Sequence, residues 1–175
     1  KIFIPNRFES VLEDSRFEYS ALLMNVQSDL KKFESLANLI RVQNGGILAF
    51  LIGASGVGKT SSVYSASVFL KDQFDGVVSV PPEMALRDVM KWLQVSISIK
   101  KEKITLVLFD GREVTDDHIG LKELISSLNQ LLRRRNDLLF VWPTTDSDWH
   151  SELRDIVEKV GGSNLSPEEA DVYIE

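Results

Sequence analysis

The chain lacks cysteine and lacks any apolar run long enough to span a membrane. None of its 175 residues is cysteine, which excludes a disulfide framework, thiol chemistry and a zinc–thiolate site. A membrane-spanning helix needs about 18–20 consecutive apolar residues, and no run approaches that length. Glu9, Glu13 and Asp14 fall where a secretory signal would be apolar. We therefore expect an intracellular, soluble protein, cytoplasmic or nuclear, with no membrane partner.

Basic residues are outnumbered by acidic ones. The chain has 20 Lys and Arg against 26 Asp and Glu, a formal net charge of −6. Its basic cluster, Arg133–Arg135, ends a predicted helix, where cations complement the helix dipole and stay solvated. Without a wider basic stripe, we expect this chain not to bind nucleic acid directly. The hydrophobic share of 43% is typical of a globular domain with a real core.

Short apolar runs alternate with helical periodicity, and this alternation predicts an α/β fold. Unbroken apolar runs are typical of parallel strands that helices cover on both faces. Apolar stripes at i, i+3 and i+4 between the runs predict crossover helices. We expect three layers, with helices flanking a mainly parallel sheet of about five strands. The clearest runs occupy residues 47–52, 77–80, 104–109 and 138–142.

A phosphate-binding motif follows the first predicted strand. Gly53–Thr60, GASGVGKT, matches G-x-x-x-x-G-K-[ST] between a strand and a helix. Glycines allow successive backbone N–H groups to surround a phosphate, and the next helix directs its positive end to the same place. Lys59 adds a charge for the β- and γ-phosphates, and the Thr60 hydroxyl suits Mg²⁺. The predicted nucleotide-binding residues are Gly53, Ala54, Ser55, Gly56, Val57, Gly58, Lys59, Thr60 and Ser61.

A magnesium–nucleotide site also needs an acid at the end of a neighbouring strand. Asp110 ends the apolar run 104–109, and Gly111 lets the chain turn away. Open α/β sheets bind ligands at the carboxyl ends of their strands. We therefore predict that Thr60 and Asp110 are the Mg²⁺ ligands.

Together, GASGVGKT, LVLFD and the fourth strand, which runs into Pro143, resemble the P-loop ATPases of the AAA+ type and the related STAND signalling ATPases. The resemblance covers residues 44–175. It implies a P-loop NTPase fold, ATP and Mg²⁺ as ligands, and ATP hydrolysis. It also implies a polar residue at the end of the fourth strand, Thr145 or Asp146, that contacts the γ-phosphate or the attacking water. The preference for adenine over guanine rests on this resemblance alone.

The tail resembles a further part of these ATPases. Asn164–Ala170, NLSPEEA, is similar to the junction where a small helical lid begins. With the helical spacing before the first strand, we expect an N-terminal helical extension (1–46), a P-loop core (47–165) and the start of a truncated lid (166–175). In the extension, apolar residues between Leu22 and Ile40 predict an amphipathic helical pair packed on the sheet. The resemblance further implies a larger protein that assembles as a homo-oligomer or with partner subunits.

One position departs from the family pattern. Gly111 stands where these ATPases carry the glutamate that polarises water, and the nearest acid is Glu113. Glu113 is either the catalytic base or a surface carboxylate. We expect an ATP-binding and ATP-hydrolysing module, with a small-molecule P-loop kinase or a non-hydrolysing nucleotide-dependent interaction switch as alternatives. The candidate catalytic residues are Lys59, Asp110, Glu113, Thr145 and Asp146.

Overall fold

A four-stranded, all-parallel sheet forms the centre of the protein. The computed structural model describes residues 19–53, 59–110 and 117–160. The strands lie in the order β1-β4-β3-β2. The predicted α/β class is confirmed, although the described residues contain four strands where we expected about five. The strands are β1 (Ile47–Ile52), β2 (Phe74–Ser79), β3 (Ile104–Leu108) and β4 (Leu138–Thr144).

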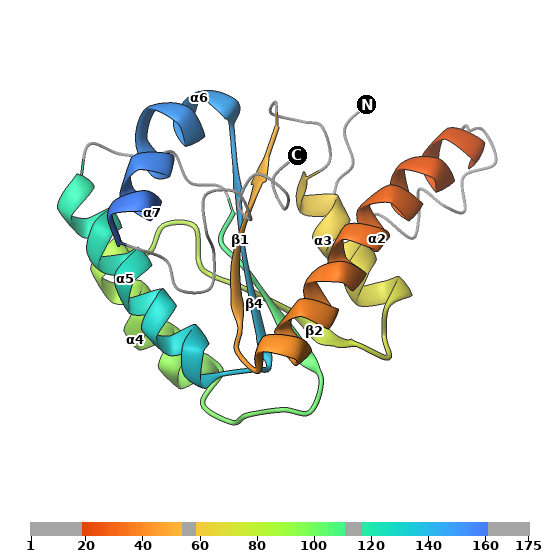
Figure 1. Ribbon diagram of the computed structural model, residues 1–175, viewed down its shortest axis with the longest axis horizontal. Helices are drawn as coiled ribbons and strands as arrows, with labels where there is room; N and C mark the ends of the chain where they lie inside the picture. The colour runs from red at the N-terminus through yellow and green to blue at the C-terminus, as the bar shows by residue number, and fades with distance from the viewer. Residues whose placement is uncertain (1–18, 54–58, 111–116, 161–175) are drawn as a thin grey trace.

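Helices cover both faces of the sheet (Figure 1). On one face lie α2 (Tyr19–Gln43) and α3 (Lys59–Phe69), which pack against each other. The other face carries α4 (Leu86–Ser96), α5 (His118–Arg134) and α7 (Arg154–Val160). The expected three-layer arrangement is therefore present in the described part of the chain.

The N-terminal segment differs from our prediction of a helical pair. A single 25-residue helix, α2, covers all the apolar positions from Leu22 to Ile40. Phe33, Leu36 and Ile40 on this helix are at most 2% exposed and belong to the same core as the strands. The helix thus completes one hydrophobic layer. No described helix, α2 included, has the length and apolar character that a membrane span requires.

An aromatic cluster supports the carboxyl end of the sheet. The ring centroids of Phe50 and Trp149 are 4.8 Å apart, and those of Phe109 and Trp142 are 4.6 Å apart. All four side chains are at most 2% exposed. Aromatic pairs at this spacing contribute about 0.5–1.5 kcal/mol beyond the area they bury. Buried aromatic rings therefore pack together near the carboxyl ends of β1, β3 and β4.

Strand β4 continues two residues further than the apolar run predicted, through Pro143. Proline lacks the N–H that a central strand uses on its ladder. Here the Val141 carbonyl accepts from the Phe109 N–H at 2.9 Å, so by alternation Pro143 also faces the β3 side. The pairing with β3 ends at Leu108 and Val141, so Pro143 lies beyond the last residue of β4 that is paired with β3. Thr144 consequently remains paired with Ile52 on the β1 side.

Candidate functional site

The site lies at the carboxyl edge of the sheet, where three strands end together. Ile52 is opposite Thr144, and the Gly53 N–H donates to the Thr144 carbonyl at 3.2 Å. Strand β4 lies between β1 and β3, so the residues after it stand between Gly53 on one side and Asp110 on the other. The structure thus brings together three segments that are far apart in sequence.

Lys59 is the first residue of α3, and its ammonium points back to this edge. Its Nζ donates to the Gly53 carbonyl at 2.6 Å and to the Thr144 carbonyl at 2.8 Å. Burial lowers the pKa of Lys59 below 10.5, and the charges of Asp110 and Asp146 oppose that shift. No carboxylate among the described residues is within ion-pair distance of this ammonium. Its partners are neutral carbonyls, which an anionic ligand can replace.

The next residue joins α3 to the end of β3. The Thr60 hydroxyl donates to Asp110 Oδ2 at 2.7 Å. Both residues are partly buried. Mg²⁺ prefers oxygen ligands and is usually held by one or two protein oxygens together with water and phosphate. This pair of adjacent oxygens fits that pattern.

A third residue of α3 has an unused polar group. The Ser61 Oγ is buried in a side chain only 2% exposed, and no described residue hydrogen-bonds to it. A buried hydroxyl without a partner costs free energy that native proteins seldom leave uncompensated. Ser61 therefore adds a buried donor and acceptor beside Lys59 and Thr60 in the first turn of α3.

The two residues predicted to sense phosphate have different roles in the fold. The Thr145 hydroxyl accepts from the Asp148 N–H at 3.2 Å, which makes Thr145 the N-cap of α6 (Asp146–Asp148). Its hydroxyl oxygen is therefore already engaged in this structure. Asp146 is exposed, and its charge acts on Lys59. Of the two side chains, Asp146 has the more direct electrostatic influence on the site.

Several predicted site residues lie outside the described residues, and their prediction stays open. They are the interior of the glycine-rich motif, the candidate base and the residue that replaces the usual glutamate: Ala54, Ser55, Gly56, Val57, Gly58, Glu113 and Gly111. The predicted start of the lid, residues 166–175, also falls outside.

Sequence reasoning missed one participant in the site. Thr144 contributes a backbone carbonyl. Every residue has such a carbonyl, so the residue type does not indicate that it is used. The signal that could have found it is the strand register, since the end of β4 aligns with the end of β1.

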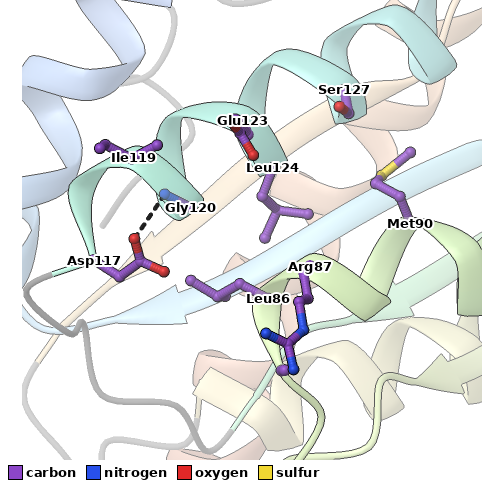
Figure 2. A pocket seen from close by; sticks show the side chains of 10 residues that line it. Leu86, Arg87, Met90, Asp117, Ile119, Gly120, Glu123, Leu124 and Ser127 are labelled. Atoms are coloured by element: carbon purple, nitrogen blue, oxygen red, sulfur yellow. Dashed lines mark hydrogen bonds between the residues drawn. The ribbon is translucent and has the colours of Figure 1, made fainter.

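A second hollow lies between two helices on one face of the sheet. Figure 2 shows a groove between α4 and α5 that is lined by Leu86, Met90 and Leu124, with Arg87 and Glu123 at its sides. Its volume is about 390 Å³. The groove combines apolar walls with charges of both signs, and it contains none of the predicted nucleotide-binding residues.

Comparison of this chain with protein-family models, curated proteins and solved structures found no match in any of the three. Within residues 19–53, 59–110 and 117–160 there is also no group of three or more His, Asp or Glu that could hold a metal ion on its own. The case for a function therefore rests on the motif and the geometry around it.

Proposed function

We propose that this chain binds Mg²⁺–ATP at the carboxyl edge of its sheet and hydrolyses it as a module of a larger protein. The observation that carries the proposal is the convergence of Lys59, Thr60 and Asp110 from the start of α3 and the end of β3. This is the arrangement that the motif requires: an ammonium for phosphate oxygens, and a hydroxyl and a carboxylate side by side.

The chemistry expected of these groups is positioning and charge neutralisation. Phosphoryl transfer needs little covalent help, because its transition state spreads negative charge over phosphate oxygens. Lys59 would bind those oxygens, and Ser61 could fill its hydrogen-bonding capacity on the same ligand. Thr60 and Asp110 would hold Mg²⁺, which neutralises phosphate charge when bound. Orientation of the attacking water would fall to an acid, with Glu113 as the candidate.

The test of binding is Lys59→Ala. Loss of a charged hydrogen-bond donor costs about 1.5–3 kcal/mol, so we expect ATP affinity to fall about 100-fold while the fold remains intact. Isothermal titration calorimetry with ATP and Mg²⁺ measures the affinity. Lys122→Ala, on the exposed side of α5, is the matched control and should leave the affinity unchanged. Equal affinity in Lys59→Ala and wild type would refute the pocket assignment.

The fate of the γ-phosphate separates hydrolysis from the two alternatives. Wild-type protein is incubated with γ-labelled ATP and Mg²⁺. Release as free phosphate supports an ATPase. Transfer to an added acceptor supports a small-molecule kinase, and retention of intact ATP supports a nucleotide-dependent switch.

A further inference from the structure

We propose that the Thr144 carbonyl and the nucleotide phosphates compete for Lys59, and that the release of this carbonyl loosens the helical segment that Thr145 caps. The inference rests on the proposed function, since it concerns regulation of the same site. With this competition, the conformation at the end of β4 depends on whether Lys59 is bound by protein carbonyls or by a ligand.

The competition follows from the contacts of Lys59. An ammonium has three donors, and two of them are occupied by the Gly53 and Thr144 carbonyls at 2.6 and 2.8 Å. A bond from the ammonium to a phosphate oxygen joins two opposite charges, whereas a bond to a carbonyl joins one charge to a neutral dipole, so the phosphate is the stronger acceptor. A triphosphate oxygen therefore draws Lys59 away from Thr144. The Thr144 carbonyl then keeps only its 3.2 Å bond from the Gly53 N–H among the bonds seen here.

The Thr144 carbonyl is directly linked to a helix cap. It belongs to the same rigid peptide plane as the Thr145 nitrogen, so rotation of that plane moves Thr145. Thr145 holds the first turn at two points. Its hydroxyl accepts from the Asp148 N–H at 3.2 Å, and its carbonyl accepts from the Trp149 N–H at 3.0 Å. An N-cap of this kind contributes about 1 kcal/mol to helix stability.

The segment after Thr145 has a helical geometry that is often found at functional sites. After α6 it contains a π-helical stretch, η2 (Trp149–Leu153), before α7. Stretches of π-helix are rare and frequent at functional sites. Within η2, Glu152 Oε2 lies 3.0 Å from His118 Nε2, at the first residue of α5. The segment that Thr145 caps therefore runs directly into a π-helical stretch.

Amide hydrogen exchange at Asp148 and Trp149 tests the proposal. Without nucleotide, Lys59→Ala should exchange these two amides about fivefold faster than wild type, because about 1 kcal/mol of local stability is removed. The Gly120 amide is the matched control, since Asp117 caps it at 2.9 Å by an equivalent bond with no Lys59 contact. Its rate should not change.

The second arm adds Mg²⁺–ATP at saturation. Wild type should show the same acceleration at Asp148 and Trp149, and Thr145→Ala, which lacks the cap, should exchange fast with or without ATP. ATP that binds without changing these amides, or a Lys59→Ala protein with wild-type rates, would overturn the inference and leave the proposed function standing. Absence of any ATP binding by calorimetry would instead overturn the proposed function and the inference together.

Discussion

The two edges of the sheet both carry a cation in a partly buried setting, yet they treat it differently. At the carboxyl edge, Lys59 donates to two neutral carbonyls. At the amino edge, Arg135 forms a two-point ion pair with Asp137, with Nε–Oδ1 at 2.7 Å and Nη2–Oδ2 at 2.8 Å. A ligand can replace the carbonyl partners of Lys59, whereas the partners of Arg135 are fixed by the fold.

The amino edge is a closed polar cluster. Besides Arg135, Asp137 accepts from the Lys101 N–H at 3.0 Å, and Arg135 also donates to the Ile97 carbonyl at 2.8 Å. Asp137 is 1% exposed. The loop between α4 and β3 and the turn between α5 and β4 meet there. This cluster ties the loops at that edge together.

The shifts in pKa show the same contrast. Burial pushes the pKa of Asp137 upward, but the hydrogen bonds from Arg135 and Lys101 and the charge of Arg135 outweigh it, so the pKa lies below 3.8. The hydrogen bond to Asp137 raises the pKa of Arg135. Burial instead dominates at Lys59 and lowers its pKa. An ion pair compensates burial at one edge, and the other edge leaves the cation under-compensated, as a binding site for an anion requires.

Removal of the carboxylate at the amino edge should have the largest effect on stability. Asp137→Asn leaves Arg135 charged and only 15% exposed without its ion-pair partner. Breaking a buried pair from one side costs about 3 kcal/mol or more. Urea denaturation should report that loss in the free energy of unfolding, and ATP affinity should remain unchanged.

Asp75→Asn is the matched control for that experiment. Asp75 pairs with Lys101 at 2.6 Å, but both side chains are at least 40% exposed. Exposed pairs contribute about 0.2–1 kcal/mol, so the change should be small. Equal losses in the two variants would contradict the distinction between a closed structural cluster and a solvated surface pair.

A glycine at the amino edge provides the next test. A Cβ at Gly46 would lie 2.7 Å from the carbonyl oxygens of Arg135 and Leu138, and these backbone atoms cannot move aside cheaply. Gly46→Ala should therefore destabilise the protein by about 2 kcal/mol, within the range for overpacked sites. The control is Gly76→Ala in β2, where a Cβ meets nothing within 4 Å. Thermal unfolding of both variants measures the difference, and a control as unstable as Gly46→Ala would refute the steric explanation.

How far the sequence predicts this structure differs between the two edges. The motif around Lys59 and the acid Asp110 were predictable, because their residue types and spacing encode a specific chemistry. The role of Arg135 was predicted wrongly as a solvated cation at a helix end. Its partner Asp137 is two residues away, but the burial that makes the pair structural depends on α4 and the segment before β3, and such tertiary packing leaves no local pattern.

The boundaries of the strands were also only partly predictable from the sequence. Apolar runs located all four strands of the described residues, but the run for β4 ended at Trp142, because apolar character stops there while the strand does not. Only the register shows that β3 has already ended beside Pro143. The helical pair expected between Leu22 and Ile40 was likewise wrong, since a continuous amphipathic stripe does not show whether a helix is broken.

Acid should weaken the amino edge first. The pKa of Asp137 in the folded state lies below its ordinary value of 3.8, so its contribution to stability is complete above that value and is lost as the pH falls through the folded-state pKa. The free energy of unfolding should drop below pH 3.8 more steeply in wild type than in Asp137→Asn. Urea denaturation from pH 6 to about pH 2.5 measures both slopes. Parallel curves would show that another carboxylate is responsible.

Asp146→Asn should have the smallest effect, and it acts at the carboxyl edge. The exposed Asp146 carboxylate attracts Lys59 and repels phosphate, so its neutralisation should strengthen ATP binding about twofold to threefold, the size expected of a solvated charge interaction. Calorimetry at low salt measures the change, and Asp155→Asn, exposed on α7, is the control for net charge alone. Weaker binding in Asp146→Asn would mean that this carboxylate helps to hold the nucleotide. The carboxyl edge would then use an acid as the amino edge does. The contrast between Lys59, whose partners a ligand can replace, and Arg135, whose partners are fixed, would need revision.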